Sequence, residues 1–457
     1  MKNVIYVIIL CLIFLCSCKE VIKTENNTVD VTELLREEEK QEMGKSLKIT
    51  KITTKNDDEI FKRQVERYKE KYPDIDIKIT EYDDYNKFIS AINIQIESGS
   101  LDDLVDATYL DYNKLMDNGN IVNYKKLIET DYAFDIGDYY VNVLDAFNYR
   151  NAWPVFPISF VYGLIGVNNE LPPFVVDQYI RHQTINTDDL WDLYKLIYHD
   201  DWYPDIDFTL PNILVRDLGS YIDFNNKTCN ISSNINFIRL LEDSKKYFEE
   251  ELDYFNRLGG SNASIYNDNL LEERALQYAF LKAHCFNTQF IMQNNSISFS
   301  NFVPLVNRNG EINIEMFTGF VLNNASENKT LAWNFLKYVT SVENNIDIGE
   351  IDIPYMPYVP INKMVFEQLY KSQCIRQINN LKYTENEIVG DVDENINKAI
   401  KILKIYNEHP MRYNDYLSVI FTLFETISPY FSGEADAVQV ADELQNRIIS
   451  VLNGWYP

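Results

Sequence analysis

Residues 48–80, KITKITTKNDDEIFKRQVERYKEKYPDIDIKIT, predict a strand, a helix and a second strand in immediate succession. Residues 48–54 have the composition of a strand, and residues 56–58 then offer side-chain oxygens that cap a helix. Apolar residues follow at helical spacing, at Phe61, Val65, Tyr68 and Tyr72. Pro73 ends this helix, and the next segment alternates as strands do, at Ile75, Ile77 and Ile79.

The same alternation continues along the chain. A second helix is predicted from apolar residues at helical spacing that end near Gly99: Tyr85, Phe88, Ile89, Ile92 and Ile96. Residues 101–109, LDDLVDATY, then predict a short buried strand. Strands that alternate with helices indicate a largely parallel α/β sheet. Ligands of such sheets bind beyond the carboxyl ends of the strands, here residues 54–58 and 108–111.

The N-terminus predicts an export signal with a lipid attachment point. Residues 4–15 form an apolar run of about a dozen residues, which suits a signal peptide and is shorter than a membrane span. The run ends in Leu15-Cys16-Ser17-Cys18, which resembles a bacterial lipobox with Cys18 as the lipidated residue. We therefore expect a signal peptide over residues 1–17, and a lipidated cysteine with a polar tether over residues 18–46. A cleaved secretory signal with incidental cysteines is the alternative.

Composition limits the possible partners. The chain has 457 residues and a formal net charge of −27, which disfavours nucleic acid and anionic lipid as partners. Its length exceeds one simple core, so two lobes are expected. The cysteines after the leader are isolated and odd in number, namely Cys229, Cys285 and Cys374. They form no disulfide framework or zinc motif, and we expect no metal and no cofactor.

Several stretches, in this order, resemble extracellular solute-binding protein family 1, the carbohydrate-type substrate-binding lipoproteins of ABC importers. The clearest are residues 317–344, FTGFVLNNASENKTLAWNFLKYVTSVEN, and residues 428–453, SPYFSGEADAVQVADELQNRIISVLN. Residues 153–172, WPVFPISFVYGLIGVNNELP, and residues 355–369, YMPYVPINKMVFEQL, resemble two of the family's chain crossings. The chain departs from the family at Asp102, where proline is usual, and at residues 167–169, where Val-Asn-Asn replaces Tyr-Asn-Lys.

The resemblance implies a periplasmic-binding-protein-like fold of two α/β lobes, with three hinge crossings and a ligand cleft between the lobes. The crossings would fall near residues 157–160, 300 and 355–360. Lobe one would hold residues 47–158 and 300–354, and lobe two residues 159–299 and 355–457. It also implies a monomeric receptor at the extracytoplasmic face of the cell membrane. This receptor would capture a sugar or oligosaccharide by hinge closure and present it to permease subunits.

A sugar site uses aromatic rings against pyranose C–H faces and carboxylates against hydroxyl groups. Residues of both kinds lie at predicted strand ends and crossings: Asp57, Asp58, Tyr109, Asp111, Trp153, Phe160, Tyr162, Trp202, Phe317 and Tyr355. Each has a plain structural alternative, because Asp57 and Asp58 can cap a helix and aromatic residues of an apolar strand can fill a core. Phe317 precedes Gly319, where a backbone could approach a ligand closely.

Three other function classes remain as alternatives. A surface carbohydrate-active enzyme would use paired carboxylates, which are plentiful, but the four histidines are isolated and no catalytic motif is present. An adhesion or scaffold lipoprotein would show repeats or Thr/Pro-rich stalks, and the chain has neither. The same fold could also bind a peptide, a polyol or a sugar phosphate. We expect a binding protein that is not an enzyme.

Overall fold

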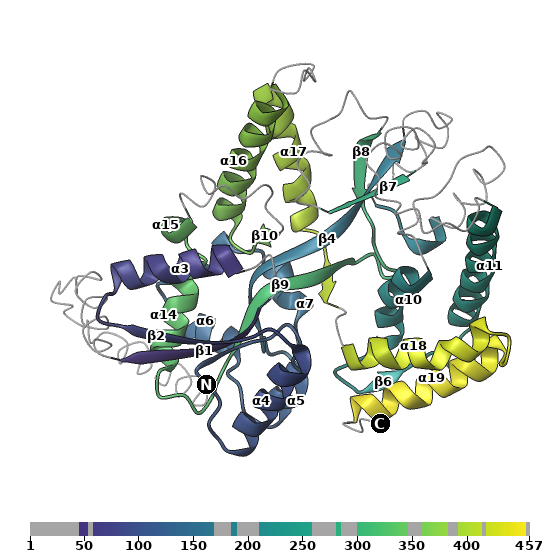
Figure 1. The fold of residues 1–457 in the computed structure, drawn as a ribbon, viewed down its shortest axis with the longest axis horizontal. Coiled ribbons are helices and arrows are strands. Elements are labelled where there is room, and N and C mark those ends of the chain that lie inside the picture. Colours follow the sequence, from purple (N-terminus) through teal and green to yellow (C-terminus); the bar gives the residue numbers. More distant parts are fainter. Residues whose placement is uncertain are drawn as a thin grey trace, which may run out of the picture. The chain divides into compact units, whose positions relative to one another are not determined.

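The computed structural model describes residues 45–53, 58–168, 184–189, 210–257, 280–284, 299–345, 358–382, 392–413 and 417–453 (Figure 1). Among these residues, no helix is both long and apolar enough to cross a membrane. Cys18 and the rest of the predicted leader and tether up to residue 44 lie outside the described residues.

The predicted strand–helix alternation is confirmed. It comprises β1 (Ser46–Ile52), α3 (Asp58–Lys71), β2 (Asp76–Tyr82), α4 (Tyr85–Glu97) and β3 (Leu104–Asp106). Strand β1 is parallel to both β2 and β3, with Ile49 opposite Ile79 on one side and Leu104 on the other. Leu47 is fully buried in β1, and residues 49–52 are buried in succession, as in a parallel strand that is covered on both faces.

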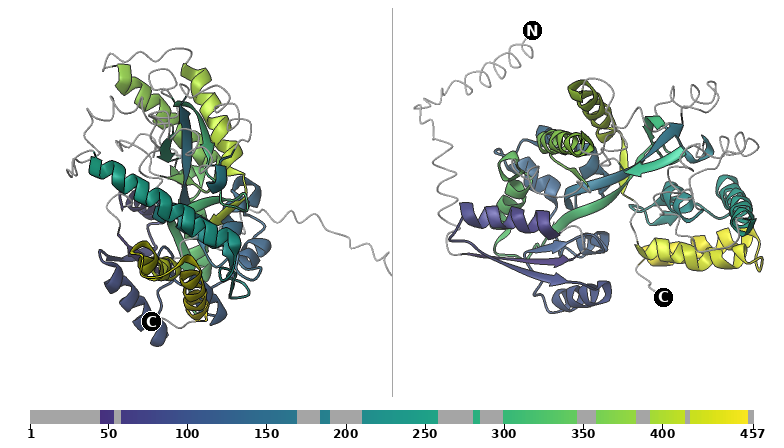
Figure 2. Two further views of the ribbon diagram at one scale, coloured as in Figure 1. Left: turned by 90° about the vertical axis from the view of Figure 1, so that its right-hand side faces the viewer. Right: turned by 45° about the horizontal axis from the view of Figure 1, so that its top comes forward.

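Long antiparallel strands extend this sheet, whose main order is β10-β4-β9-β3-β1-β2. Strand β9 (Ile312–Leu322) pairs with β3 on one side and with β4 (Phe156–Asn168) on the other. The second half of β4 pairs with β7 (Phe280–His284) and β8 (Phe299–Pro304), as Figures 1 and 2 show. Strand β10 (Val359–Pro360) lies beside β4, so the predicted first crossing and the end of the third are neighbours.

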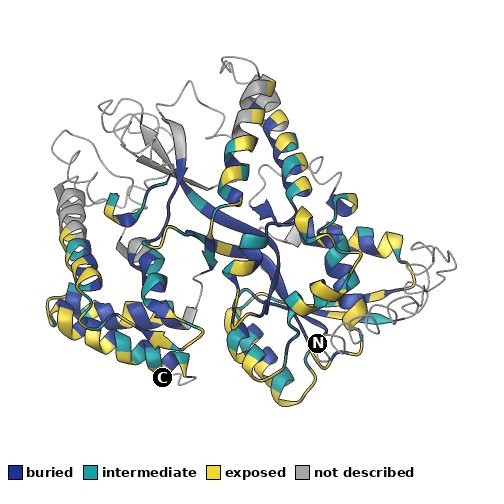
Figure 3. Ribbon diagram, turned by 180° about the vertical axis from the view of Figure 1, so that it is seen from behind, coloured by how far each residue is buried: buried dark blue, intermediate teal, exposed yellow. Residues whose placement is uncertain are grey.

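The remaining described elements are mostly helices. They are α5 (Tyr112–Asp117), α6 (Tyr124–Thr130), η2 (Ile136–Asp138), α7 (Val141–Ala146), α10 (Leu210–Leu218), η4 (Gly219–Tyr221), β5 (Ile222–Asp223), β6 (Thr228–Cys229), α11 (Ile235–Arg257), α14 (Lys329–Val339), α15 (Val342–Asn345), α16 (Lys363–Lys382), α17 (Val392–Asn407), β11 (Met411–Tyr413), α18 (Leu417–Phe431) and α19 (Ala437–Leu452). Figure 3 shows their amphipathic character, with buried faces toward the sheet or toward another helix and exposed faces outward.

The buried apolar residues form two cores. The first core surrounds β1, β3, β4 and β9, and it includes α3, α14 and parts of α16 and α17. The second core joins α10 and α11 to α18, α19 and the β5–β6 hairpin. Buried residues between Tyr358 and Tyr413 pack in the first core, although the resemblance placed them in lobe two. The lobe boundaries stay a prediction.

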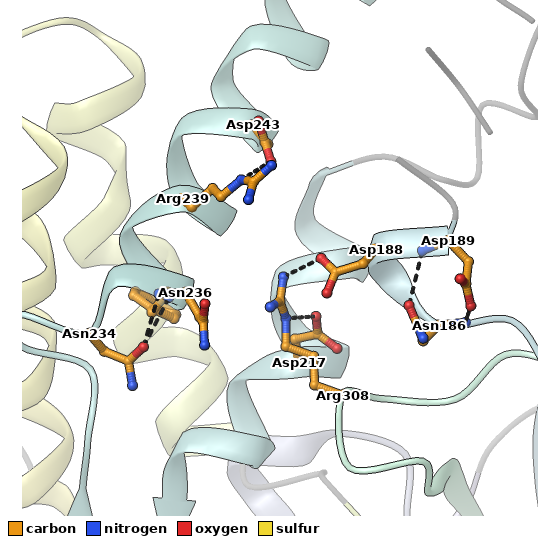
Figure 4. Close-up of polar contacts among 10 residues, drawn as sticks. Asn186, Asp188, Asp189, Asp217, Asn234, Asn236, Arg239, Asp243 and Arg308 are labelled. Carbon is orange, nitrogen blue, oxygen red and sulfur yellow. Dashed lines mark hydrogen bonds and ion pairs between the residues drawn. The ribbon is translucent and has the colours of Figure 1, made fainter. Parts of the chain in front are cut away.

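A buried ion pair ties the turn between β8 and β9 to α10. The Nε atom of Arg308 lies 3.1 Å from Oδ2 of Asp217, and a terminal nitrogen lies 2.8 Å from Oδ1 of Asp188 (Figure 4). The Asp217 side chain is 0% exposed, whereas that of Asp188 is 61% exposed. Burial raises the pKa of Asp217, and the positive charge of Arg308 opposes that shift. Arg308 therefore compensates a carboxylate that water cannot reach.

We predict that Arg308→Met destabilises the fold by about 3 kcal/mol, because it removes the ion-pair partner of a fully buried carboxylate. Asp188→Asn is the matched control, since an exposed pair contributes no more than about 1 kcal/mol. Urea unfolding followed by far-UV circular dichroism measures both variants. Equal midpoints for the two variants would contradict the assignment of Asp217 as the partner that matters.

Candidate ligand-binding site

The carboxyl end of β3 carries a buried aspartate that shapes the following turn. Oδ1 of Asp106 accepts hydrogen bonds from the Thr108 backbone N–H (3.0 Å) and from the Thr108 hydroxyl (2.6 Å). Burial raises the pKa of Asp106, and the charge of nearby Lys51 on β1 opposes that shift. Lys51 is itself 1% exposed, and its ammonium group donates to the Ile52 carbonyl (3.1 Å). These groups hold the chain in place where it leaves the sheet toward Tyr109.

Tyr109 lies partly exposed just beyond this turn, where the sequence places it. Its ring meets that of Tyr85 edge to face, with centroids 5.3 Å apart, and Tyr85 is itself 39% exposed. Asp111 is exposed, and its side chain caps α5 by accepting the Lys114 backbone N–H (3.0 Å). Capping uses Oδ1 of the carboxylate, so the capping and ligand roles of Asp111 are compatible. The ligand roles of Tyr109 and Asp111 stay predictions.

Phe317 reaches the same end of the sheet from β9. The chain after β3 continues beside β9, because the Ala107 N–H donates to the Gly319 carbonyl (2.9 Å). Tyr109 lies two residues after Ala107, and Phe317 lies two residues before Gly319 on the antiparallel strand β9. The Phe317 ring is partly exposed and packs against Tyr358, which precedes β10, at a centroid distance of 4.9 Å. Aromatic rings from three neighbouring chain segments therefore line this end of the sheet.

Gly319 has a structural explanation that the sequence interpretation missed. A Cβ atom at this position would lie 3.1 Å from Cα of Pro157 on β4, and it would also collide with the Met316 side chain. The backbone that approaches Gly319 closely is therefore a neighbouring strand of the same sheet. The register of β4 against β9 shifts at this point, between Pro157 and Ser159.

Three predicted ligand residues fill the core instead of facing outward. Trp153 is buried, and its indole N–H donates to Oδ1 of Asp145 (3.0 Å). Phe160 is fully buried, and Tyr162 donates its hydroxyl hydrogen to the side-chain oxygen of Asn407 (2.8 Å). These contacts match the packing alternative for each ring. We therefore leave Trp153, Phe160 and Tyr162 out of the candidate site.

The other predicted positions cannot be placed in the site. Asp57, Trp202 and Tyr355 lie outside the described residues, and Asp58 begins α3. Sequence reasoning did not select Asp106, Tyr85 or Tyr358, although Asp106 ends the very strand whose carboxyl end, residues 108–111, was singled out. Within the described parts of the chain, no group of His, Cys, Asp and Glu could hold a metal ion.

Comparison with solved structures identifies the fold. No protein-family model and no curated protein matches the sequence. An extracellular solute-binding protein of family 1 from Alicyclobacillus acidocaldarius has a TM-score of 0.55 at 10% identity, covering 89% of this chain and 98% of that one. A periplasmic oligogalacturonide binding protein from Yersinia enterocolitica has a TM-score of 0.55 at 12% identity, covering 90% and 99%. An ABC substrate-binding protein from Listeria monocytogenes, in complex with cycloalternan, has a TM-score of 0.52 at 12% identity, covering 90% and 100%.

These neighbours are two-lobed α/β binding proteins, so the predicted fold class is confirmed. The resemblance to extracellular solute-binding protein family 1 is confirmed at the level of the fold.

We predict that Gly319→Ala destabilises the protein by about 1–3 kcal/mol, because the added methyl group overlaps the Met316 side chain and presses on the β4 backbone at Pro157. Gly163→Ala on β4 is the control. A Cβ atom there meets no atom within 4 Å, so its effect should stay within about 0.5 kcal/mol. Urea unfolding compares the two variants. A Gly319→Ala midpoint equal to that of Gly163→Ala would contradict the close approach to Pro157.

Proposed function

We propose that this chain is the extracytoplasmic substrate-binding protein of an ABC importer. It captures a sugar or oligosaccharide between its lobes and presents it to the membrane permease, acting as a monomer that makes and breaks no bond. The observation that carries the proposal is the shared fold, over about nine tenths of the chain, with proteins that bind carbohydrates: cycloalternan, oligogalacturonide, acarbose and maltose. Tyr109 and Asp111 after β3, and Phe317 within β9, offer the kinds of group that suit such a ligand.

The chemistry of these groups favours a neutral, polyhydroxylated ligand. Tyr109 and Phe317 offer partly exposed ring faces, on which the C–H face of a pyranose can pack. Asp111 offers an exposed carboxylate to hydroxyl groups, and the net charge of −27 disfavours anionic ligands such as sugar phosphates. A peptide or a polyol is the nearest alternative for the same fold.

A thermal-shift screen of the chain without its leader tests this function against mono- and oligosaccharides, peptides and amino acids. A ligand that binds only the folded form stabilises it by about 2.7 kcal/mol at a hundredfold excess over its Kd. Stabilisation by one sugar class, with no breakdown of that sugar on chromatography, supports the proposal. Breakdown products would favour the enzyme instead, and stabilisation by peptides alone would replace the carbohydrate as the ligand.

For a sugar identified in this way, we predict that Tyr109→Ala raises the Kd about tenfold, equivalent to about 1.4 kcal/mol of lost stacking. Tyr132→Ala is the matched control, because the Tyr132 ring is fully exposed and lies on a different loop. Isothermal titration calorimetry gives both constants. If Tyr109→Ala and Tyr132→Ala both keep the wild-type Kd, Tyr109 is not part of the ligand site.

We further propose that Cys18 carries a lipid that anchors the mature chain to the outer face of the cell membrane, with residues 19–46 as its tether. One acyl chain binds a membrane only marginally, so stable anchoring needs a cysteine that carries at least two. Tethering keeps the receptor close to its permease and raises its effective concentration there.

In a bacterial host fed an alkynyl fatty acid, we predict that the wild-type chain and Cys16→Ala incorporate the label, whereas Cys18→Ala does not. The two cysteines lie two positions apart, so Cys16→Ala controls for general damage to the leader. In-gel fluorescence after click coupling measures incorporation. A wild-type chain that is secreted without label would favour the ordinary secretory signal.

A further inference from the structure

Residues 149–152 form a tight turn that carries an unexpected residue. The backbone N–H groups of Tyr149 and Ala152 each donate to the other's carbonyl, both at 2.9 Å. Between them, Arg150 has a φ of 48° and Asn151 a φ of 62°. Two consecutive positive φ values characterise a type I′ turn, which favours Asn-Gly. An arginine in the left-handed region costs about 1 kcal/mol, so the contacts of its side chain have to explain its presence.

A second turn meets this one. Strands β5 and β6 form a hairpin whose loop ends at Lys227, another non-glycine residue with a positive φ, of 55°. At the tip of this loop, the Asn225 side-chain oxygen accepts the Arg150 backbone N–H at 2.6 Å. The Asn225 carbonyl accepts Nε–H of Arg150 at 3.2 Å. The tips of two hairpin turns are therefore joined by hydrogen bonds.

Asp117, the last residue of α5, accepts hydrogen bonds from both turns. Its Oδ1 lies 2.8 Å from a terminal nitrogen of Arg150, and its Oδ2 lies 2.8 Å from the Tyr149 hydroxyl and 3.2 Å from Nζ of Lys227. Burial alone would raise the pKa of Asp117, but hydrogen bonds from Tyr149 and Lys227 together with the charge of Arg150 lower it. Asp117 is therefore an ionised acceptor shared by three donors. We call Asp117, Tyr149, Arg150, Asn225 and Lys227 the Asp117 junction.

The Asp117 junction links the two cores. Leu115 of α5 and Phe147 belong to the first core, whereas Ile222 and Cys229 of the β5–β6 hairpin belong to the second. None of its five residues lies on β4, β8 or β10, the strands at which the predicted crossings lie. The junction can therefore form or break when the crossings bend, without any change in strand pairing.

We propose that the Asp117 junction fixes the relative orientation of the two cores and thereby sets ligand affinity without touching the ligand. The link to affinity rests on the proposed function, and the effect on orientation does not. An interaction made in one of two orientations shifts their equilibrium by its difference in free energy, and ligand affinity follows the population of the competent orientation.

The test measures the distance between the cores with no ligand present. Genetically encoded spin labels at Glu129 on α6 and Val438 on α19, both exposed, report this distance by double electron–electron resonance and leave the native cysteines untouched. Two variants break the Asp117 junction. Asp117→Asn removes the charge at nearly constant shape, and Arg150→Gly removes the guanidinium while relaxing the turn, because glycine accepts a positive φ. Glu343→Gln is the control, since it removes an exposed ion pair with Lys71 (2.7 Å) that joins α3 to α15, two helices whose apolar residues pack in the first core.

We expect both junction variants to shift or broaden the distance distribution in the same direction, and Glu343→Gln to match the wild type. Junction variants that overlay the wild type would overturn the inference, as would a control that shifts as far as they do. The result does not depend on finding a ligand. A chain that binds no sugar yet shows the shift would overturn the proposed function and leave the Asp117 junction in place.

Discussion

The close approach of β4 to β9 at Pro157 and Gly319 is the contact on which the rest of the structure depends. On one side, β9 pairs with β3 and so with the parallel strands β1 and β2. On the other side, β4 continues past β9 to pair with β7 and β8. A Cβ atom at position 319 would lie 3.1 Å from Cα of Pro157 and would collide with Sδ of Met316, so glycine fits here without displacing its neighbours. A displaced β4 would loosen both halves of the sheet at once.

This contact also shows what the sequence can and cannot predict. The alternation from β1 to β3 was predictable from local signals, namely helical spacing in α3 and α4, alternation in β2, and strand composition in β1 and β3, which need no information from distant segments. In β4, by contrast, Phe160 and Tyr162 are buried on one face and Val161 is buried on the other, because other elements cover both faces of the strand. An apolar strand of this kind has no polar face in its sequence. The sequence pattern of β4 therefore could not distinguish an aromatic side chain that packs in the core from one that contacts a ligand.

The aromatic richness of the chain illustrates the same limit. Tyr124, Phe156 and Trp333 form one buried cluster, in which the Trp333 indole N–H donates to Asp131 (2.7 Å). Tyr109 and Phe317 belong to the same residue classes but are partly exposed, Tyr109 after the end of β3 and Phe317 within β9. Exposure depends on neighbours far away in sequence, as when Tyr358 meets Phe317 across β4. A high content of Tyr and Phe therefore indicates a large core at least as much as a carbohydrate site.

Asp217 and Asp117 each join segments that are far apart in the sequence, and their different burial gives the two contacts different properties. Asp217 is shielded from water, so its bond to Arg308 has no solvated alternative and holds the β8–β9 turn on α10 in one arrangement. The Asp117 side chain is 26% exposed, and water can replace its partners at small cost. The receptor proposed above, which closes around its ligand, would need both kinds of contact. It needs fixed contacts beside the crossing strands, where the chain must not slip, and exchangeable contacts away from them, where a small free energy can shift the balance between orientations.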